Sequence, residues 1–201
     1  MTKTARDFLT EIGYDETIHD LRLQENWPSL LKYCRRVDRQ LGRRIRACAG
    51  RPAQPLVEYQ RARWAVLWCI SIALRGLNLH AESIRVAEQY VSAVARQPHD
   101  AWDMYYALSQ LATRCMEASQ PERAKSVLHR AMVEGARSGR IGPVIDGLNL
   151  LASFERQLGQ EDRRAVYEQL ARDVETSVEL GKHPSTWLRN WKRKAATDVD
   201  Y

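Results

Sequence analysis

Apolar residues near the start of the chain recur with the period of an α-helix. They are separated by steps of four, three, four, four and three, which places them in one stripe along a helix: Leu30, Cys34, Val37, Leu41, Ile45 and Cys48. Asn26 or Ser29 supplies a capping side chain before this stripe, and Gly50 and Pro52 follow it. The pattern predicts a helix over 27–48.

The next segment, 55–77, is apolar on nearly all sides. Pro55 opens it, and its centre holds large apolar residues at almost every position: Trp64, Val66, Leu67, Trp68, Ile70, Ile72 and Leu74. A helix without a polar face must be covered on several sides. We therefore expect this helix to be the central element of the fold.

Proline and glycine divide the rest of the chain into further helical patterns. No run alternates between apolar and polar residues, so almost no strand is expected and the predicted fold class is all-α. Two short helices are predicted at the N-terminus, over 3–12 and 15–24. Five more are predicted after residue 79, over 80–96, 99–118, 121 onward, 143–158 and 161–180. A last short helix is predicted to begin at Ser185.

The helical segments form an internal repeat. The sequence ALSQLA begins at Ala107 and GLNLLA begins at Gly147, a shift of 40 residues, and Ala124 and Ala165 in the following helices are 41 apart. A helix with one apolar stripe cannot bury that stripe alone, so neighbouring hairpins must stack. The chain is thus expected to be a series of antiparallel helix pairs.

One unit of the repeat resembles the tetratricopeptide-repeat (TPR) family. The residues that carry the resemblance have the family's spacing: Leu108, Leu111, Ala112, Cys115, Ala124, Leu128 and Ala131. The likeness extends over 56–180 with degenerate units on either side. It implies a right-handed array of helix hairpins, a TPR-like α-solenoid, with N-terminal helices over 1–54, repeats over 55–181 and a C-terminal capping helix and tail over 182–201. A generic array of α–α hairpins is the alternative.

The resemblance also implies a binding function. Such arrays hold a peptide or helix in a groove lined by the first helix of each hairpin. By position, the partner-binding groove would contain Tyr105, Tyr106, Ser109, Thr113, Asp146, Asn149, Ser153 and Arg156. The equivalent positions of the first hairpin, Leu67, Ile70 and Leu74, are wholly apolar, so we expect the N-terminal helices to cover them.

Charge adds a second candidate surface. The 201 residues carry a formal net charge of +6, yet segment 32–51 alone has eight basic residues and one acid, Asp38. This basic patch comprises Arg35, Arg36, Arg39, Arg43, Arg44 and Arg46 on the helix predicted over 27–48. Arginine binds carboxylate and phosphate in a bidentate manner. A solvated helix face without a binding role is one interpretation of these arginines. Among binding roles, an acidic protein partner is favoured over a nucleic-acid-binding regulator that uses this helix, because no aromatic residue is interleaved to stack bases.

No motif for catalysis or metal binding accompanies these surfaces. The five histidines lack metal-ligand spacing, and phosphate-binding glycine loops and nucleophile elbows are absent from the sequence. Four cysteines occupy apolar helical positions without a CxxC pair, as expected for reduced core thiols. We expect a cytoplasmic, non-catalytic adaptor, secretion-type chaperone or regulator that needs no cofactor, does not enter a membrane and forms a homodimer.

Overall fold

The computed structural model describes residues 9–10, 14–48, 53–96, 99–137 and 141–179. Within these ranges the chain forms helices and turns and no strand, which confirms the all-α fold class. The described helices are α2 (Tyr14–Leu23), α3 (Trp27–Ala47), α4 (Ala53–Gly76), α5 (His80–Ala95), α6 (Ala101–Glu117), α7 (Pro121–Arg137), α8 (Gly142–Gln157) and α9 (Glu161–Glu179). The predicted helices 3–12 and 185 onward lie largely or wholly outside the described residues.

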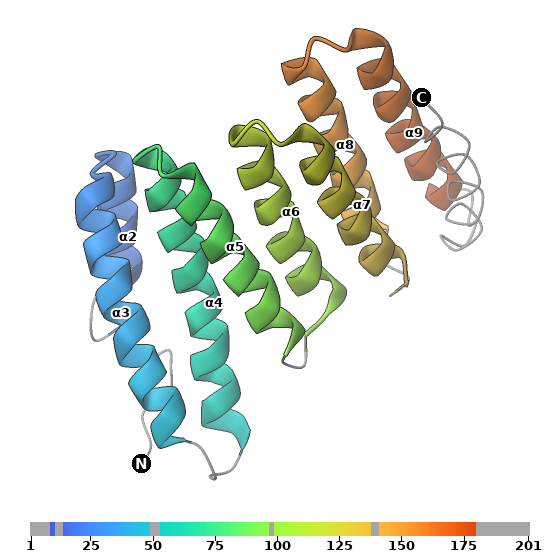
Figure 1. Ribbon diagram of the computed structural model, residues 1–201. Coiled ribbons are helices and arrows are strands. Elements are labelled where there is room, and N and C mark those ends of the chain that lie inside the picture. Colours follow the sequence, from blue (N-terminus) through green and yellow to red (C-terminus); the bar gives the residue numbers. More distant parts are fainter. Residues whose placement is uncertain (1–8, 11–13, 49–52, 97–98, 138–140, 180–201) are drawn as a thin grey trace. The chain divides into compact units, whose positions relative to one another are not determined.

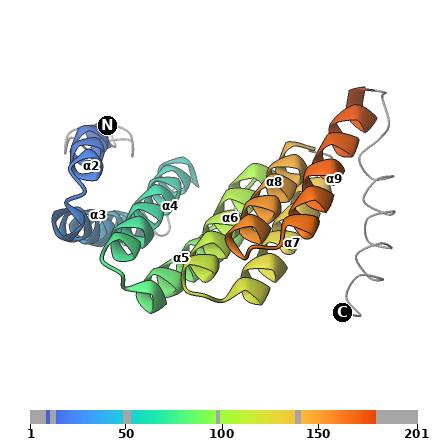
Figure 2. The ribbon, with the colours of Figure 1, turned by 90° about the horizontal axis from the view of Figure 1, so that it is seen from above.

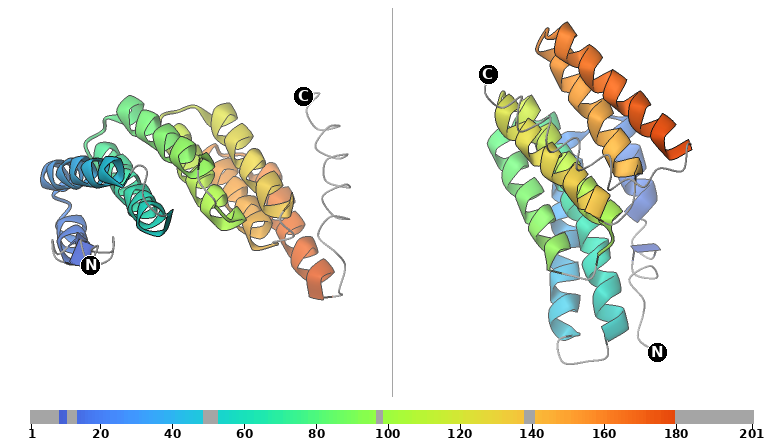
Figure 3. Two further views of the ribbon diagram at one scale, coloured as in Figure 1. Left: turned by 90° about the horizontal axis from the view of Figure 1, so that it is seen from below. Right: turned by 90° about the vertical axis from the view of Figure 1, so that its right-hand side faces the viewer.

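The helices pack against their neighbours in the sequence (Figure 1). The chain divides into two compact units, Met1–Pro98 and His99–Tyr201. In the first unit α2 packs on α3, α3 on α4 and α4 on α5; in the second, α6 packs on α7, α7 on α8 and α8 on α9. In the second unit α8 and α9 run side by side in opposite directions, as the right-hand view of Figure 3 shows. Each unit is therefore a run of helix hairpins, the arrangement expected of a helical repeat.

The turns inside the hairpins repeat the same backbone geometry. Asn78, Ser119 and Gly159 each follow a helix with a positive φ, of 59°, 58° and 71°. The residue after each donates its backbone N–H across the end of the helix: Leu79 to Leu74, Gln120 to Cys115 and Gln160 to Glu155. The three turns are 41 and 40 residues apart, matching the shift seen in the sequence repeat. The repeat is thus structural as well as sequential.

Local sequence signals account for several helix starts. Asn26 caps α3 by accepting a hydrogen bond at Oδ1 from the Ser29 backbone N–H, at 3.3 Å. Asp100 and Asp103 form a reciprocal capping box at α6, in which each carboxylate accepts from the other residue's backbone N–H. Pro121 begins α7, where its missing N–H costs nothing.

The core of the first unit lies between α2, α3 and α4. The predicted stripe of α3 is buried in it, with Leu30, Cys34, Val37 and Leu41 all at 0% exposure. Ile70 and Leu74 of α4 belong to the same core, together with Tyr14 and Ile18 of α2. These two apolar positions of the first hairpin are therefore covered by the N-terminal helices, as expected.

Two further features of the helices concern their cysteines and their length. All four cysteines, Cys34, Cys48, Cys69 and Cys115, are buried and free. Across the described residues, none of the helices is both long and apolar enough to pass through a lipid bilayer.

Candidate functional site

The predicted groove residues lie on α6 and α8, which contact each other within the second unit (Figure 2). Tyr106 is 53% exposed, and Asp146, Asn149 and Arg156 are also exposed. Thr113 and Ser153 are partly exposed, whereas Tyr105 and Ser109 are only 4% and 6% exposed. The predicted groove residues that are exposed or partly exposed on these two helices are together called the α6/α8 face: Tyr106, Thr113, Asp146, Asn149, Ser153 and Arg156.

Three aromatic rings meet at the N-terminal end of α6. Trp102 stacks on Tyr106 with ring centroids 5.7 Å apart and meets Tyr105 edge-on at 5.9 Å. Tyr105 and Tyr106 are also in edge contact, at 5.8 Å. The rings of this aromatic cluster hold one another in place, so the exposed Tyr106 ring has a fixed support.

Gly142 makes room for this cluster at the start of α8. A Cβ atom on Gly142 would lie 2.6 Å from Cζ2 of the Trp102 ring, closer than real atoms approach. The absence of a side chain therefore lets α8 approach the aromatic cluster of α6. Trp102 is not among the predicted groove residues, and its spacing of four residues to Tyr106, about one helical turn, is the signal that could have placed it there.

The hydroxyl groups of Ser109 and Thr113 are already bonded to their own helix, α6. Ser109 Oγ donates to the Tyr106 carbonyl at 3.0 Å, and Thr113 Oγ1 donates to the Ser109 carbonyl at 2.9 Å. Burial, with a smaller contribution from the Asp146 carboxylate, raises the pKa of Tyr105 well above its usual value. Tyr105 and Ser109 are therefore part of the packed interior. The side chains of Tyr106, Asp146 and Asn149 remain accessible to a partner.

The structure divides the basic patch into two groups. Arg35, Arg36 and Arg44 have partners within the first unit. Arg35 Nη2 lies 3.5 Å from Glu82 Oε2, and the Arg36 guanidinium lies 5.0 Å from the centre of the Tyr33 ring. Arg44 donates to the Tyr59 hydroxyl at 3.5 Å and also lies over that ring. Arg35 and Arg44 thus link α3 to α5 and α4, whereas Arg36 packs on a ring of α3 itself.

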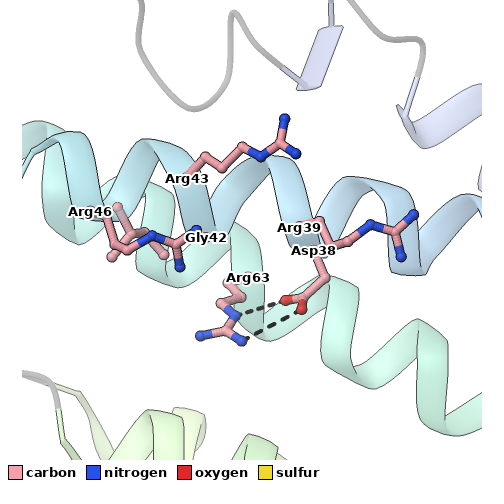
Figure 4. A pocket seen from close by; sticks show the side chains of 7 residues that line it. Asp38, Arg39, Gly42, Arg43, Arg46 and Arg63 are labelled. Atoms are coloured by element: carbon pink, nitrogen blue, oxygen red, sulfur yellow. Dashed lines mark hydrogen bonds and ion pairs between the residues drawn. The ribbon is translucent and has the colours of Figure 1, made fainter.

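Arg39, Arg43 and Arg46 form the second group, and no acidic partner pairs with them among the described residues. They line an open pocket of about 470 Å³ together with Asp38, Gly42 and Ile45 of α3 and Arg63 of α4 (Figure 4). Arg46 lies beside Gly42, while Arg39 and Arg43 extend outward from α3. We call this feature the arginine pocket.

Arg63 is the member of the arginine pocket that sequence reasoning missed. Its Nε donates to Asp38 Oδ1 at 2.7 Å and its Nη2 donates to Asp38 Oδ2 at 3.5 Å, joining α4 to α3. The isolated acid Asp38 within a basic segment was the signal that a basic residue from another helix would approach it.

Neither surface has the composition of a metal centre, and comparisons with known proteins add no assignment. Across the described ranges, no group of three or more histidine, cysteine and acidic side chains is arranged to hold a metal ion. No protein-family model matches the chain. No curated protein is significantly similar to it in sequence.

Proposed function

We propose that the chain is a non-catalytic protein–protein interaction module of TPR-like design, which binds a peptide or a helix of its partner on the α6/α8 face. Adaptor, secretion-type chaperone and regulator are the roles that suit such a module. A cytoplasmic location and a homodimer belong to the same proposal.

The observation that carries the proposal is the exposed Tyr106 ring supported by Trp102. A tyrosine that is 53% exposed and also stacked on a neighbouring ring at 5.7 Å presents a large contact area without a further loss of side-chain freedom on binding. Tryptophan and tyrosine are the residue types that dominate binding energy at protein interfaces. Asp146 and Asn149 of α8 supply polar groups on the same face for orientation.

The second candidate, a nucleic-acid-binding regulator, is supported by Arg39, Arg43 and Arg46 of α3, which have no acidic partner within the part of the chain that the structure describes. It predicts an affinity that falls steeply with salt, because each phosphate contact releases a counterion. A partner held by the α6/α8 face would depend much less on salt, since aromatic contacts are not screened. The two candidates are therefore separable by salt and by nuclease.

The test uses the full chain as an immobilised bait in a lysate of the native cell, with and without nuclease treatment. Wild type, Tyr106→Ala/Asn149→Ala and the matched control Val166→Ala/Glu175→Ala on α9 are compared by quantitative mass spectrometry. The control removes a similarly exposed apolar side chain, since Val166 is 56% exposed. We expect a protein that wild type and control retain equally and that the Tyr106/Asn149 variant loses by about tenfold or more. Equal capture by all three baits, or capture that disappears with nuclease, contradicts the proposal.

A further inference from the structure

We infer that the arginine pocket binds an acidic segment of a partner protein, with carboxylates spaced one helical turn apart. This inference rests on the proposed function only in that the partner is a protein. The pocket belongs to the first unit and the α6/α8 face to the second. Each can therefore be tested without the other.

The charge of the pocket is strongly unbalanced. Four guanidinium groups line it and Asp38 is its single carboxylate, so its net charge is +3. Arg63 occupies both oxygens of Asp38, at 2.7 and 3.5 Å, and this pairing removes the one local repulsion that an incoming anion would meet. Arg39, Arg43 and Arg46 are left to attract anionic groups.

The spacing of these arginines fits a helical acidic segment. Arg39 and Arg43 are one turn apart on α3, a rise of about 6 Å, and Arg46 lies about 4.5 Å further along. Carboxylates at positions i, i+4 and i+7 of an acidic helix have the same separations along its axis. Each guanidinium fork can take one carboxylate with two parallel hydrogen bonds.

The floor of the pocket can accept the stem of a side chain. Gly42 adds no side chain to the surface of α3, and a Cβ atom at this position would make only an ordinary van der Waals contact, 3.7 Å from Arg46 Nη1. Ile45 adds an apolar contact beside it. The methylene groups of a glutamate or aspartate could therefore pack at Gly42 and Ile45 while its carboxylate meets the arginines.

The same lining disfavours single-stranded nucleic acid. The residues of the pocket include no aromatic ring on which a base would stack. The nearby tyrosines of this unit, Tyr33 and Tyr59, lie against Arg36 and Arg44 instead. Tyr59 is also only 4% exposed. The observations therefore favour a polypeptide ligand over a polynucleotide.

Fluorescence anisotropy with the full chain tests the inference. The probe is a labelled alanine–glutamine peptide of about 15 residues with glutamates at i, i+4 and i+7; a peptide of equal composition with clustered glutamates is the spacing control. Arg39→Gln/Arg43→Gln should weaken binding of the spaced peptide about tenfold. The matched control Arg35→Gln/Arg36→Gln removes the same charge from the same helix and should weaken binding less than about threefold.

Three further measurements complete the test. Arg39→Lys/Arg43→Lys keeps the charge but loses the forks, so it should bind more weakly than wild type. Tyr106→Ala should leave peptide binding unchanged, which separates this inference from the proposed function. Circular dichroism checks that each variant is folded. Equal losses for the two Gln variants, equal binding of both peptides, or tighter binding of a single-stranded oligonucleotide of the same charge at the same salt would overturn the inference.

Discussion

Lys125 Nζ of α7 lies 2.8 Å from Glu155 Oε1 of α8 in the interior of the second unit. The Glu155 side chain is 1% exposed and that of Lys125 is 11% exposed. Among the described residues neither oxygen of Glu155 has a well-directed hydrogen bond, so the Lys125 ammonium is the group that balances its charge. Glu122 also approaches Lys125, at 3.7 Å, but is largely exposed.

Removing one partner of this buried pair should destabilise the protein strongly. Lys125→Met leaves a buried carboxylate without a counter-charge, which lowers the free energy of unfolding by about 3–5 kcal/mol. Lys125→Met/Glu155→Leu removes both charges and should recover most of that loss. Urea unfolding followed by circular dichroism gives both values. As a control, Glu161→Gln breaks an exposed ion pair with Arg164 and should barely move the midpoint. A single variant as stable as wild type would show that the pair is not buried as described.

The turn after α6 predicts a substitution that raises the free energy of unfolding. Ser119 adopts a φ of 58° after α6, a conformation that costs a residue with a side chain about 1 kcal/mol or more. Ser119→Gly should therefore stabilise the protein by about 1 kcal/mol, because Ser119 is exposed and makes no side-chain packing that would be lost. Gly159 has the same geometry in the next hairpin, at a φ of 71°, so Gly159→Ala should destabilise by a similar amount. Thermal melts of both variants check the pair, and changes of equal sign would contradict the equivalence of the turns.

The helices were predictable because their signals are local. The stripe of α3 repeats every three or four residues, and Pro121 marks a helix start on its own. The predicted ranges 27–48 and 80–96 differ from the observed helices by a single residue at the C-terminal end. The division of the chain over 1–54, 55–181 and 182–201 stays a prediction.

The candidate sites were harder to predict because they depend on contacts between helices. Arg63 reaches Asp38 from another helix, and the sequence does not show which arginine will do so. Likewise, the sequence does not show that Arg35 pairs with Glu82 on α5, while Arg39, four residues further on, has no acidic partner in the described ranges. Side-chain partners across an interface follow from the rotation of each helix about its axis, a quantity that periodicity fixes only approximately.

The protonation of His129 should make the stability of the protein depend on pH. Burial, with a smaller contribution from the Lys125 ammonium, lowers the pKa of His129 below its usual 6.5. Below about pH 6.5, His129 binds a proton in the unfolded chain but not in the folded chain. The free energy of unfolding therefore keeps its full value above about pH 6.5 and declines as the pH falls towards the pKa of folded His129. The difference in urea midpoint between about pH 7 and about pH 5.5 should therefore shrink in His129→Gln. His19→Gln, which changes an exposed histidine of α2, should keep the wild-type difference.

Tyr105 and Tyr106 are adjacent in the sequence but should respond differently to substitution. Successive residues point about 100° apart on a helix. This rotation leaves Tyr105 at 4% exposure, inside the core, and Tyr106 at 53%. Tyr105→Ala should lower the free energy of unfolding by about 3 kcal/mol or more, because it leaves a cavity beside Trp102. Tyr106→Ala loses mainly the stacking on Trp102 and should cost about 1 kcal/mol.

Urea unfolding of the two alanine variants measures this contrast, and partner capture measures its functional counterpart. If Tyr106 acts as an anchor, Tyr106→Ala loses the partner while keeping nearly all of its stability. Tyr105→Phe provides the matched control, since it retains the ring that packs against Trp102 and should preserve both stability and capture. The opposite order of stabilities would mean that α6 is rotated about its axis relative to the structure, and the α6/α8 face would then consist of other residues.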